Sequence, residues 1–87
     1  MSYFLDFSQS AQRDIEFFKK KGNKAVLKKL YILLNELIEH PYTGTDKPEP
    51  LKYILAGTWS RRINQEHRLI YEVNEESIII HSVKGHY

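Results

Sequence analysis

The chain has no cysteine among its 87 residues, and it has only four glycines and three prolines. The absence of cysteine excludes a disulfide framework and a thiolate metal site, and it fits a reducing cytoplasm. No hydrophobic run approaches the roughly 20 residues that a transmembrane helix needs. The first residues also lack the basic start and the long apolar stretch of a signal peptide. We therefore expect a cytoplasmic protein that does not act at a membrane.

The residues that are present are enough for one small domain. Hydrophobic residues make up 41% of the chain and aromatic residues 13%, which is too much for a disordered protein. We expect a single domain spanning residues 1–87, with a modest core. The net charge is only +2, but residues 19–29 contain six lysines and no acid. This lysine patch is typical of a solvated surface, and it would also attract a polyanion such as RNA.

Two helices are predicted in the first half of the chain. Ser8 can cap a helix that begins near Gln9, and Gly22 can supply its left-handed stop. A second helix is expected over residues 23–39, because Pro41 disfavours helical geometry in the residue before it. Its apolar stripe is wide enough to lie against a sheet. The stripe comprises Val26, Leu27, Leu30, Tyr31, Leu33, Leu34, Leu37 and Ile38.

The strands are expected at the two ends of the chain. Residues 2–7 alternate as in a short strand, and residues 41–50 are typical of a loop. Period-two patterns then predict strands at 51–55, 58–64, 68–73 and 77–83. The order β-α-α-β-β-β-β predicts an α+β fold, with two helices packed on one face of a mostly antiparallel sheet. Trp59, Tyr71 and residues 78–80 are expected in the core.

Charged residues with a possible chemical role follow the second helix. Glu49 lies between two prolines, and a carboxylate on so rigid a backbone can act as a general base; a solvated connector is the alternative. Arg62 and Arg68 lie on consecutive predicted strands, where directly opposed side chains would repel unless an anion such as phosphate bound both. Lys52 adds a further cation. The alternative is separate salt bridges to Glu66, Glu72 or Glu49, as is credible for Arg61, which should face the other way.

Four histidines could exchange protons near neutral pH. His86 lies at the chain end beside Tyr87, and it is the favoured candidate. His40 is expected at a helix end, His81 in the core, and His67 on the opposite sheet face from Arg68. No histidine or acid grouping has zinc-ligand spacing, and there is no glycine-rich phosphate loop, so no metal or cofactor is expected.

Four separated segments resemble one family. They are KPEPLK at 47–52, GTWSRRI at 57–63, EHRLIY at 66–71 and HY at 86–87. Together they are similar to the YoeB/Txe toxins of type II toxin-antitoxin systems, within the RelE-type ribonuclease superfamily. The resemblance covers most of the chain, although the N-terminal third matches in pattern more than in identity. Gly85 stands where bulkier residues are expected, which predicts a looser placement of His86.

The resemblance implies a metal-independent endoribonuclease that cleaves mRNA in the translating ribosome and is held inactive by a YefM/Axe-like antitoxin. It implies Glu49 as general base, Arg68 as transition-state stabiliser and His86 as general acid. Lys52 and Arg62 would contact phosphate, and Tyr87 would position a base. It leaves a homodimer open. The alternative is a non-catalytic RelE-fold toxin or binding module that inhibits a protein target, which would not need those three catalytic side chains together.

Overall fold

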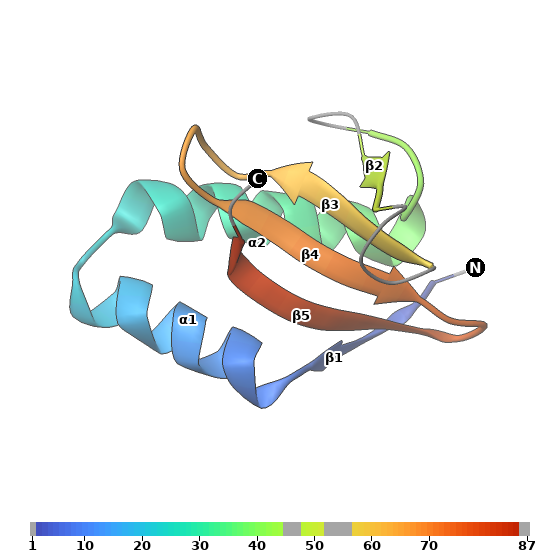
Figure 1. Ribbon diagram of the computed structural model, residues 1–87, viewed down its shortest axis with the longest axis horizontal. Coiled ribbons are helices and arrows are strands. Elements are labelled where there is room, and N and C mark those ends of the chain that lie inside the picture. The colour runs from blue at the N-terminus through green and yellow to red at the C-terminus, as the bar shows by residue number, and fades with distance from the viewer. Residues whose placement is uncertain (1, 45–47, 52–56, 86–87) are drawn as a thin grey trace.

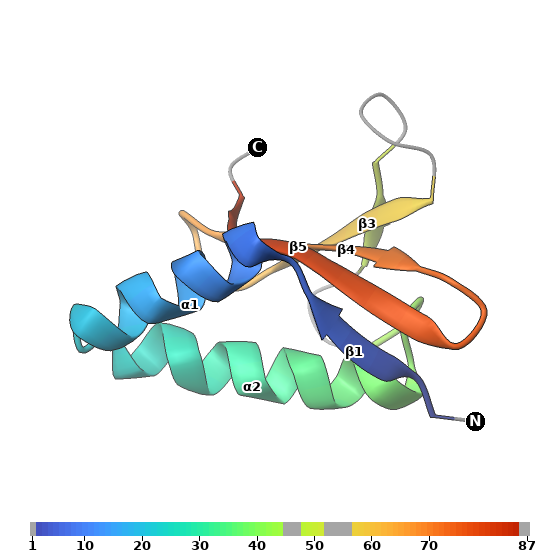
Figure 2. The ribbon, with the colours of Figure 1, turned by 90° about the horizontal axis from the view of Figure 1, so that it is seen from below.

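Two helices cover one face of a five-stranded sheet in the computed structural model, which describes residues 2–44, 48–51 and 57–85 (Figures 1 and 2). The elements follow in the order β1 (Phe4–Phe7), α1 (Gln9–Lys20), α2 (Lys24–Glu39), β2 (Glu49–Pro50), β3 (Thr58–Arg62), β4 (Arg68–Val73) and β5 (Ser77–Gly85). The sheet order is β1-β5-β4-β3-β2; β1 pairs with β5 in parallel, and the other neighbours are antiparallel. The predicted α+β fold and its β-α-α-β-β-β-β order are confirmed.

Local sequence signals set the helix ends where they were expected. The Ser8 hydroxyl accepts a hydrogen bond from the Ala11 N–H at 3.0 Å, and Asn23 Oδ1 accepts from the Val26 N–H at 3.3 Å. Each cap satisfies one of the N–H groups that a helix start leaves without an internal partner. Gly22 separates the helices with a φ of 69°, the left-handed conformation that glycine adopts without strain. The predicted Ser8 cap and Gly22 stop are therefore confirmed, and the Asn23 cap is a further feature of the structure.

The core lies between α1, α2 and the face of the sheet that they cover. Its buried members come from both layers. They are Ala11, Phe18, Val26, Leu30, Leu33, Leu34, Leu37, Ile63, Leu69, Tyr71, Ile78, Ile80 and Val83. Trp59 only packs partly against this cluster, and Tyr31, which was expected in the apolar stripe, is 48% exposed. The buried stripe of α2 is narrower than predicted, because the sheet and α1 cover only one side of the helix.

Strand limits differ from the sequence prediction at several places, beginning with β1, which starts at Phe4 and not at residue 2. A two-residue strand, Glu49–Pro50, precedes the strand expected at 51–55; Leu51 lies beyond β2, and the rest of the expected strand lies outside the described residues. The next strand ends at Arg62, because Asn64 Oδ1 accepts hydrogen bonds from the N–H groups of Glu66 and His67 and folds the chain into a turn. The last strand continues to Gly85. Within the described part of the chain, no helix is long and apolar enough to cross a membrane.

Candidate active site

The sheet register brings Glu49, Arg62 and Arg68 to the sheet face away from the helices. Glu49 on β2 pairs with Ser60 on β3, and Arg62 at the end of β3 pairs with Arg68 at the start of β4. Arg61 points toward α2, so alternation along β3 turns its neighbours Ser60 and Arg62 to the open face. Three strands thus bring together side chains that lie up to 19 positions apart in the sequence.

Glu49 and Arg68 form an ion pair in this site. Arg68 Nη1 lies 3.9 Å from Glu49 Oε2 and donates a hydrogen bond to Ser60 Oγ at 3.3 Å. The Arg68 side chain is 17% exposed, whereas that of Glu49 is 63% exposed. Ser60 therefore holds the guanidinium against the sheet, and the carboxylate stands beside it in contact with solvent. A proton acceptor next to a fixed cation is an arrangement that suits attack on a phosphate ester.

Arg62 lies directly opposite Arg68 and is exposed. The predicted opposition of the two arginines across neighbouring strands is confirmed. Arg68 also contacts Glu49, one of the three acids that the salt-bridge alternative named. The two cations and one carboxylate leave the described part of the site with an excess of positive charge, which favours an anionic ligand.

The last described residue of β5 lies beside Arg68. Gly85 is the last described residue, and it pairs with Arg68 across β4 and β5. A Cβ added to Gly85 would lie 2.8 Å from Ile70 Cγ1, so this position accepts no larger residue unless Ile70 moves. Gly85 therefore serves close strand packing in this chain. Lys52, His86 and Tyr87 lie outside the described residues. The predicted looser placement of His86 therefore stays a prediction.

Arg61 is a buried arginine whose role the sequence did not reveal. It has no exposed surface, and its Nη1 lies 3.5 Å from Glu36 Oε1. Its Nη2 donates to the backbone oxygens of His40 and Thr43, and its Nε donates to the Tyr71 hydroxyl at 3.3 Å. The acid partners considered for Arg61 were all in the second half of the chain, and that prediction is wrong. Arg61 fixes the segment between α2 and β2, the segment that leads to Glu49.

Tyr71 completes this buried network. Its hydroxyl donates to the Pro41 carbonyl oxygen at 2.7 Å. Burial raises the pKa of the Tyr71 phenol above its usual value near 10, although the hydrogen bond and charge of Arg61 act in the opposite direction. The phenol is therefore neutral at physiological pH and can donate to Pro41.

The other described histidines have structural surroundings. His67 is buried, and its ring packs edge-on against Phe18 with 5.0 Å between centroids, on the helix side as predicted. His81 was expected in the core, but its side chain is 33% exposed and its Nε2 lies 3.0 Å from Glu72 Oε1. Ile78 and Ile80 are buried in the core, so alternation along β5 turns His81 to the opposite face of the sheet, and its apolar neighbours in the sequence were misleading. Among the described residues, no group of three or more histidine and acid side chains could hold a metal ion.

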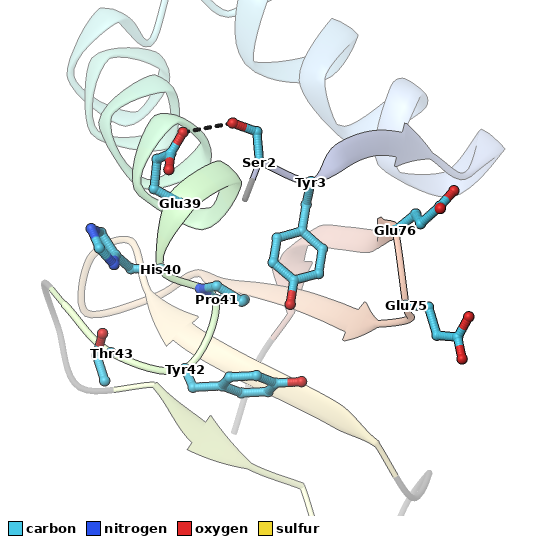
Figure 3. A pocket seen from close by; sticks show the side chains of 9 residues that line it. All are labelled: Ser2, Tyr3, Glu39, His40, Pro41, Tyr42, Thr43, Glu75 and Glu76. Carbon is cyan, nitrogen blue, oxygen red and sulfur yellow. Dashed lines mark hydrogen bonds between the residues drawn. The ribbon is translucent and has the colours of Figure 1, made fainter.

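A hollow of about 590 Å³ lies at the other end of the sheet, near the turn that joins β4 to β5 (Figure 3). Its lining comprises Ser2, Tyr3, Glu39, His40, Pro41, Tyr42, Thr43, Glu75 and Glu76. Three of these residues are glutamates, and Ser2 Oγ donates to Glu39 Oε1 at 2.8 Å. The hollow is acidic and contains none of the predicted site residues, so it does not suit a phosphate ligand.

The arrangement of two helices on a five-stranded mixed sheet is a RelE-like fold. The YafQ toxin of Escherichia coli, in its complex with DinJ, shares this fold with a TM-score of 0.82 at 17% identity, over 97% of this chain and 92% of that one. A family model described as the YoeB-like toxin of bacterial type II toxin-antitoxin systems matches residues 7–87. The chain belongs to this family.

Individual relatives agree with the family match along nearly the whole chain. Toxin YoeB of a Synechocystis strain is 40% identical over 95% of both chains, and toxin YoeB of Escherichia coli K12 is 40% identical over 85% of this chain and 88% of its own. The structure of a YoeB dimer from Staphylococcus aureus superimposes with a TM-score of 0.89 at 40% identity and covers both chains fully. A YoeB-YefM complex from the same species gives a TM-score of 0.84 at 41% identity, again over both full chains.

Proposed function

We propose that this toxin is an endoribonuclease that cleaves mRNA on the translating ribosome and thereby inhibits translation. The observation that carries the proposal is the contact of Glu49 with Arg68, 3.9 Å apart on the open face of the sheet. Arg62 lies opposite Arg68, and Gly85, which precedes His86 in the sequence, pairs with Arg68. A base, two cations and a terminal histidine can then surround one phosphodiester.

In the proposed reaction Glu49 removes the proton from a ribose 2′-hydroxyl, whose oxygen attacks the adjacent phosphorus in line. Arg68 stabilises the charge that grows on the equatorial phosphate oxygens, which is usually the largest single contribution. His86 donates a proton to the departing 5′ oxygen. The products are a 2′,3′-cyclic phosphate and a 5′-hydroxyl, so the reaction cannot proceed on DNA, which lacks the 2′-hydroxyl.

The remaining cations and the terminal ring position the substrate in this proposal. Arg62 and Lys52 contact the flanking phosphates, and Tyr87 stacks on the base at the cut position. The base, the acid and the charge stabilisation all come from side chains, so the mechanism requires no metal ion.

The proposed partners, an antitoxin and a second copy of the chain, are inferred from related structures. The Staphylococcus aureus relative is known as a YoeB dimer and in a YoeB-YefM complex. We extend this to a YefM-like antitoxin for this chain, and to a homodimer. The cations around Arg68 favour an acidic antitoxin segment that covers the site, and such a segment would block mRNA.

Cleavage of mRNA on programmed ribosomes, mapped by primer extension, tests the proposal. Glu49→Gln and His86→Gln should each reduce the single-turnover rate by about 10²–10⁴-fold, because each removes a proton-transfer group. Glu75→Gln, a matched change in the exposed turn between β4 and β5, should cleave at the wild-type rate. Thermal melting of each variant separates lost chemistry from lost folding.

Two results would contradict the proposal. Wild-type cleavage by a folded Glu49→Gln protein would remove Glu49 from the mechanism. Growth arrest by the wild-type protein without any cut mRNA would instead favour the non-catalytic alternative, a toxin that inhibits a protein target.

A further inference from the structure

The end of β5 is held by helix α1 as well as by its neighbour in the sheet. Asp14, in the middle of α1, accepts two hydrogen bonds through Oδ2. One comes from Ser82 Oγ at 3.2 Å and the other from the Val83 backbone N–H at 3.1 Å. The residues that Asp14 binds lie three and four positions before His86, a candidate catalytic residue, although Asp14 lies in the first fifth of the chain.

The Val83 N–H is available to Asp14 because the strand pairing is irregular there. Ile70 pairs with Ser82, and Arg68 pairs with Gly85. Between these pairs β4 has one residue and β5 has two, Val83 and Lys84, which is the arrangement of a β-bulge. A bulge bends its strand and redirects the residues that follow it. Asp14 stabilises the bulge with a charge-assisted hydrogen bond.

Lys84 makes a second contact with α1. Its Nζ lies 3.7 Å from the centroid of the Phe17 ring, and its N–H donates to Ser82 Oγ at 3.2 Å. Phe17 is 38% exposed and follows Asp14 by three positions, so both side chains lie on the same side of α1. Helix α1 lies beside β5 in both ribbon views (Figures 1 and 2).

We propose that Asp14 is a positioning residue for cleavage, and that it acts by fixing the direction in which β5 delivers the chain end to Arg68. This inference rests on the proposed function, because it assumes that His86 is the general acid whose position depends on the end of β5. Asp14 itself is on the helix side of the molecule and touches no RNA in the proposed reaction. The contact between Lys84 and Phe17 supports the same strand end.

Amide hydrogen exchange tests the structural half of the proposal without reference to activity. Asp14→Ala should accelerate exchange at Val83 and Lys84 and leave the middle of β4 protected. Asp14→Asn should exchange almost as the wild type does, because its side-chain oxygen can still accept the Val83 N–H. Glu16→Gln, an exposed acid on the same helix, is the matched control. Unchanged exchange in Asp14→Ala would overturn the proposal.

Single-turnover cleavage tests the functional half. Asp14→Ala should lower the cleavage rate by about 10²-fold with little change in ribosome affinity, because a displacement of about 1 Å at a catalytic group has that effect. Asp14→Asn should restore most of the rate. In a His86→Gln background, Asp14→Ala should cause little further loss, since the group that it positions is already gone.

An equal loss of rate in the two backgrounds would show that Asp14 does not act through His86, and it would overturn the proposal. A His86→Gln protein that cleaves normally would refute the catalytic role of His86 in the proposed function. Hydrogen exchange would still measure whether Asp14 stabilises the end of β5. Phe17→Leu, which keeps an apolar side chain but removes the ring, is the second variant if Asp14→Ala does not fold. It should also accelerate exchange at Lys84, and unchanged exchange there would count against the proposal.

Discussion

Arg61 and Arg62 are neighbours in the sequence and have opposite environments. Arg61 is fully buried and binds backbone oxygens, Glu36 and Tyr71, whereas Arg62 is exposed opposite Arg68. A buried guanidinium is stable only where most of its donors find acceptors, and Arg61 meets that condition. Alternation along a strand predicts that the two side chains separate. The sequence cannot show that acceptors for Arg61 come from the segment after α2.

Tyr71→Phe should lower the free energy of unfolding by roughly 1–3 kcal/mol near neutral pH, since it removes the donor to Pro41 and an acceptor for Arg61. Burial raises the pKa of Tyr71 in the folded protein. Its neutral form therefore contributes stability below about pH 10, and this contribution is lost as the pH rises and the unfolded chain deprotonates first. The gap between wild type and Tyr71→Phe should therefore narrow above about pH 10.

Urea unfolding at neutral and alkaline pH measures this difference. Tyr31→Phe is the control, because Tyr31 is 48% exposed on α2. A Tyr71→Phe protein that is no less stable than Tyr31→Phe at neutral pH would contradict the role given to the buried network.

The two helices and the long strands could be predicted from the sequence because their signals are local. Ser8, Gly22 and Asn23 mark helix ends through their own backbone and side-chain preferences. The short strand β2 could not be predicted, because its two residues become a strand only by pairing with β3. The bulges in β5 were also missed, since an extra residue in a strand is defined by its partner strand.

Gly85→Ala should displace the end of β5. The added Cβ would lie 2.8 Å from Ile70 Cγ1 and 3.0 Å from Ile70 Cδ1. Overpacking of this kind typically costs about 1–3 kcal/mol, and we expect a lower melting temperature and slower mRNA cleavage. Ile70→Ala in the same chain removes both clashing carbons, so the double variant should regain cleavage relative to Gly85→Ala. If Ile70→Ala gave no recovery, the close packing of Gly85 against Ile70 would not be what limits this position.

At the scale of the whole molecule, the lysine patch and the candidate site lie at the same end. The patch spans the turn between α1 and α2, where Phe18 packs against His67 in the turn between β3 and β4. That second turn separates Arg62 from Arg68. The two regions are therefore near one end of the molecule, on opposite sides of the sheet, and we expect only a large polyanion such as ribosomal RNA to contact both.

Replacement of Lys20, Lys21, Lys24 and Lys28 by glutamine should weaken ribosome binding and flatten its dependence on salt. All four side chains are exposed. Each phosphate contact that is lost should reduce the slope of log affinity against log salt by roughly 0.7–0.9. Arginine at the same four positions keeps the charge and should keep the slope. If the glutamine variant had the same ribosome affinity and salt dependence as the wild type, the lysine patch would contribute only to solubility.

The site itself could be predicted only in part from residue types and spacing. Alternation and strand order predicted the opposition of Arg62 and Arg68, which the register confirms. The approach of Glu49 to Arg68 depends on β2 and on the support of Ser60, and neither is visible in local sequence. The roles of Glu49, Arg68 and His86 came from the family resemblance and remain predictions.

The most direct test of the proposed chemistry places a single 2′-deoxynucleotide at the cut position of an mRNA bound to programmed ribosomes. The wild-type toxin should cleave the all-ribose message and leave the substituted message intact at that position, because the attacking 2′-hydroxyl is missing. The cleaved message should carry a 2′,3′-cyclic phosphate and a 5′-hydroxyl. Cleavage of both messages at the same position and rate would contradict attack by the 2′-hydroxyl, and with it the role of Glu49 as the base.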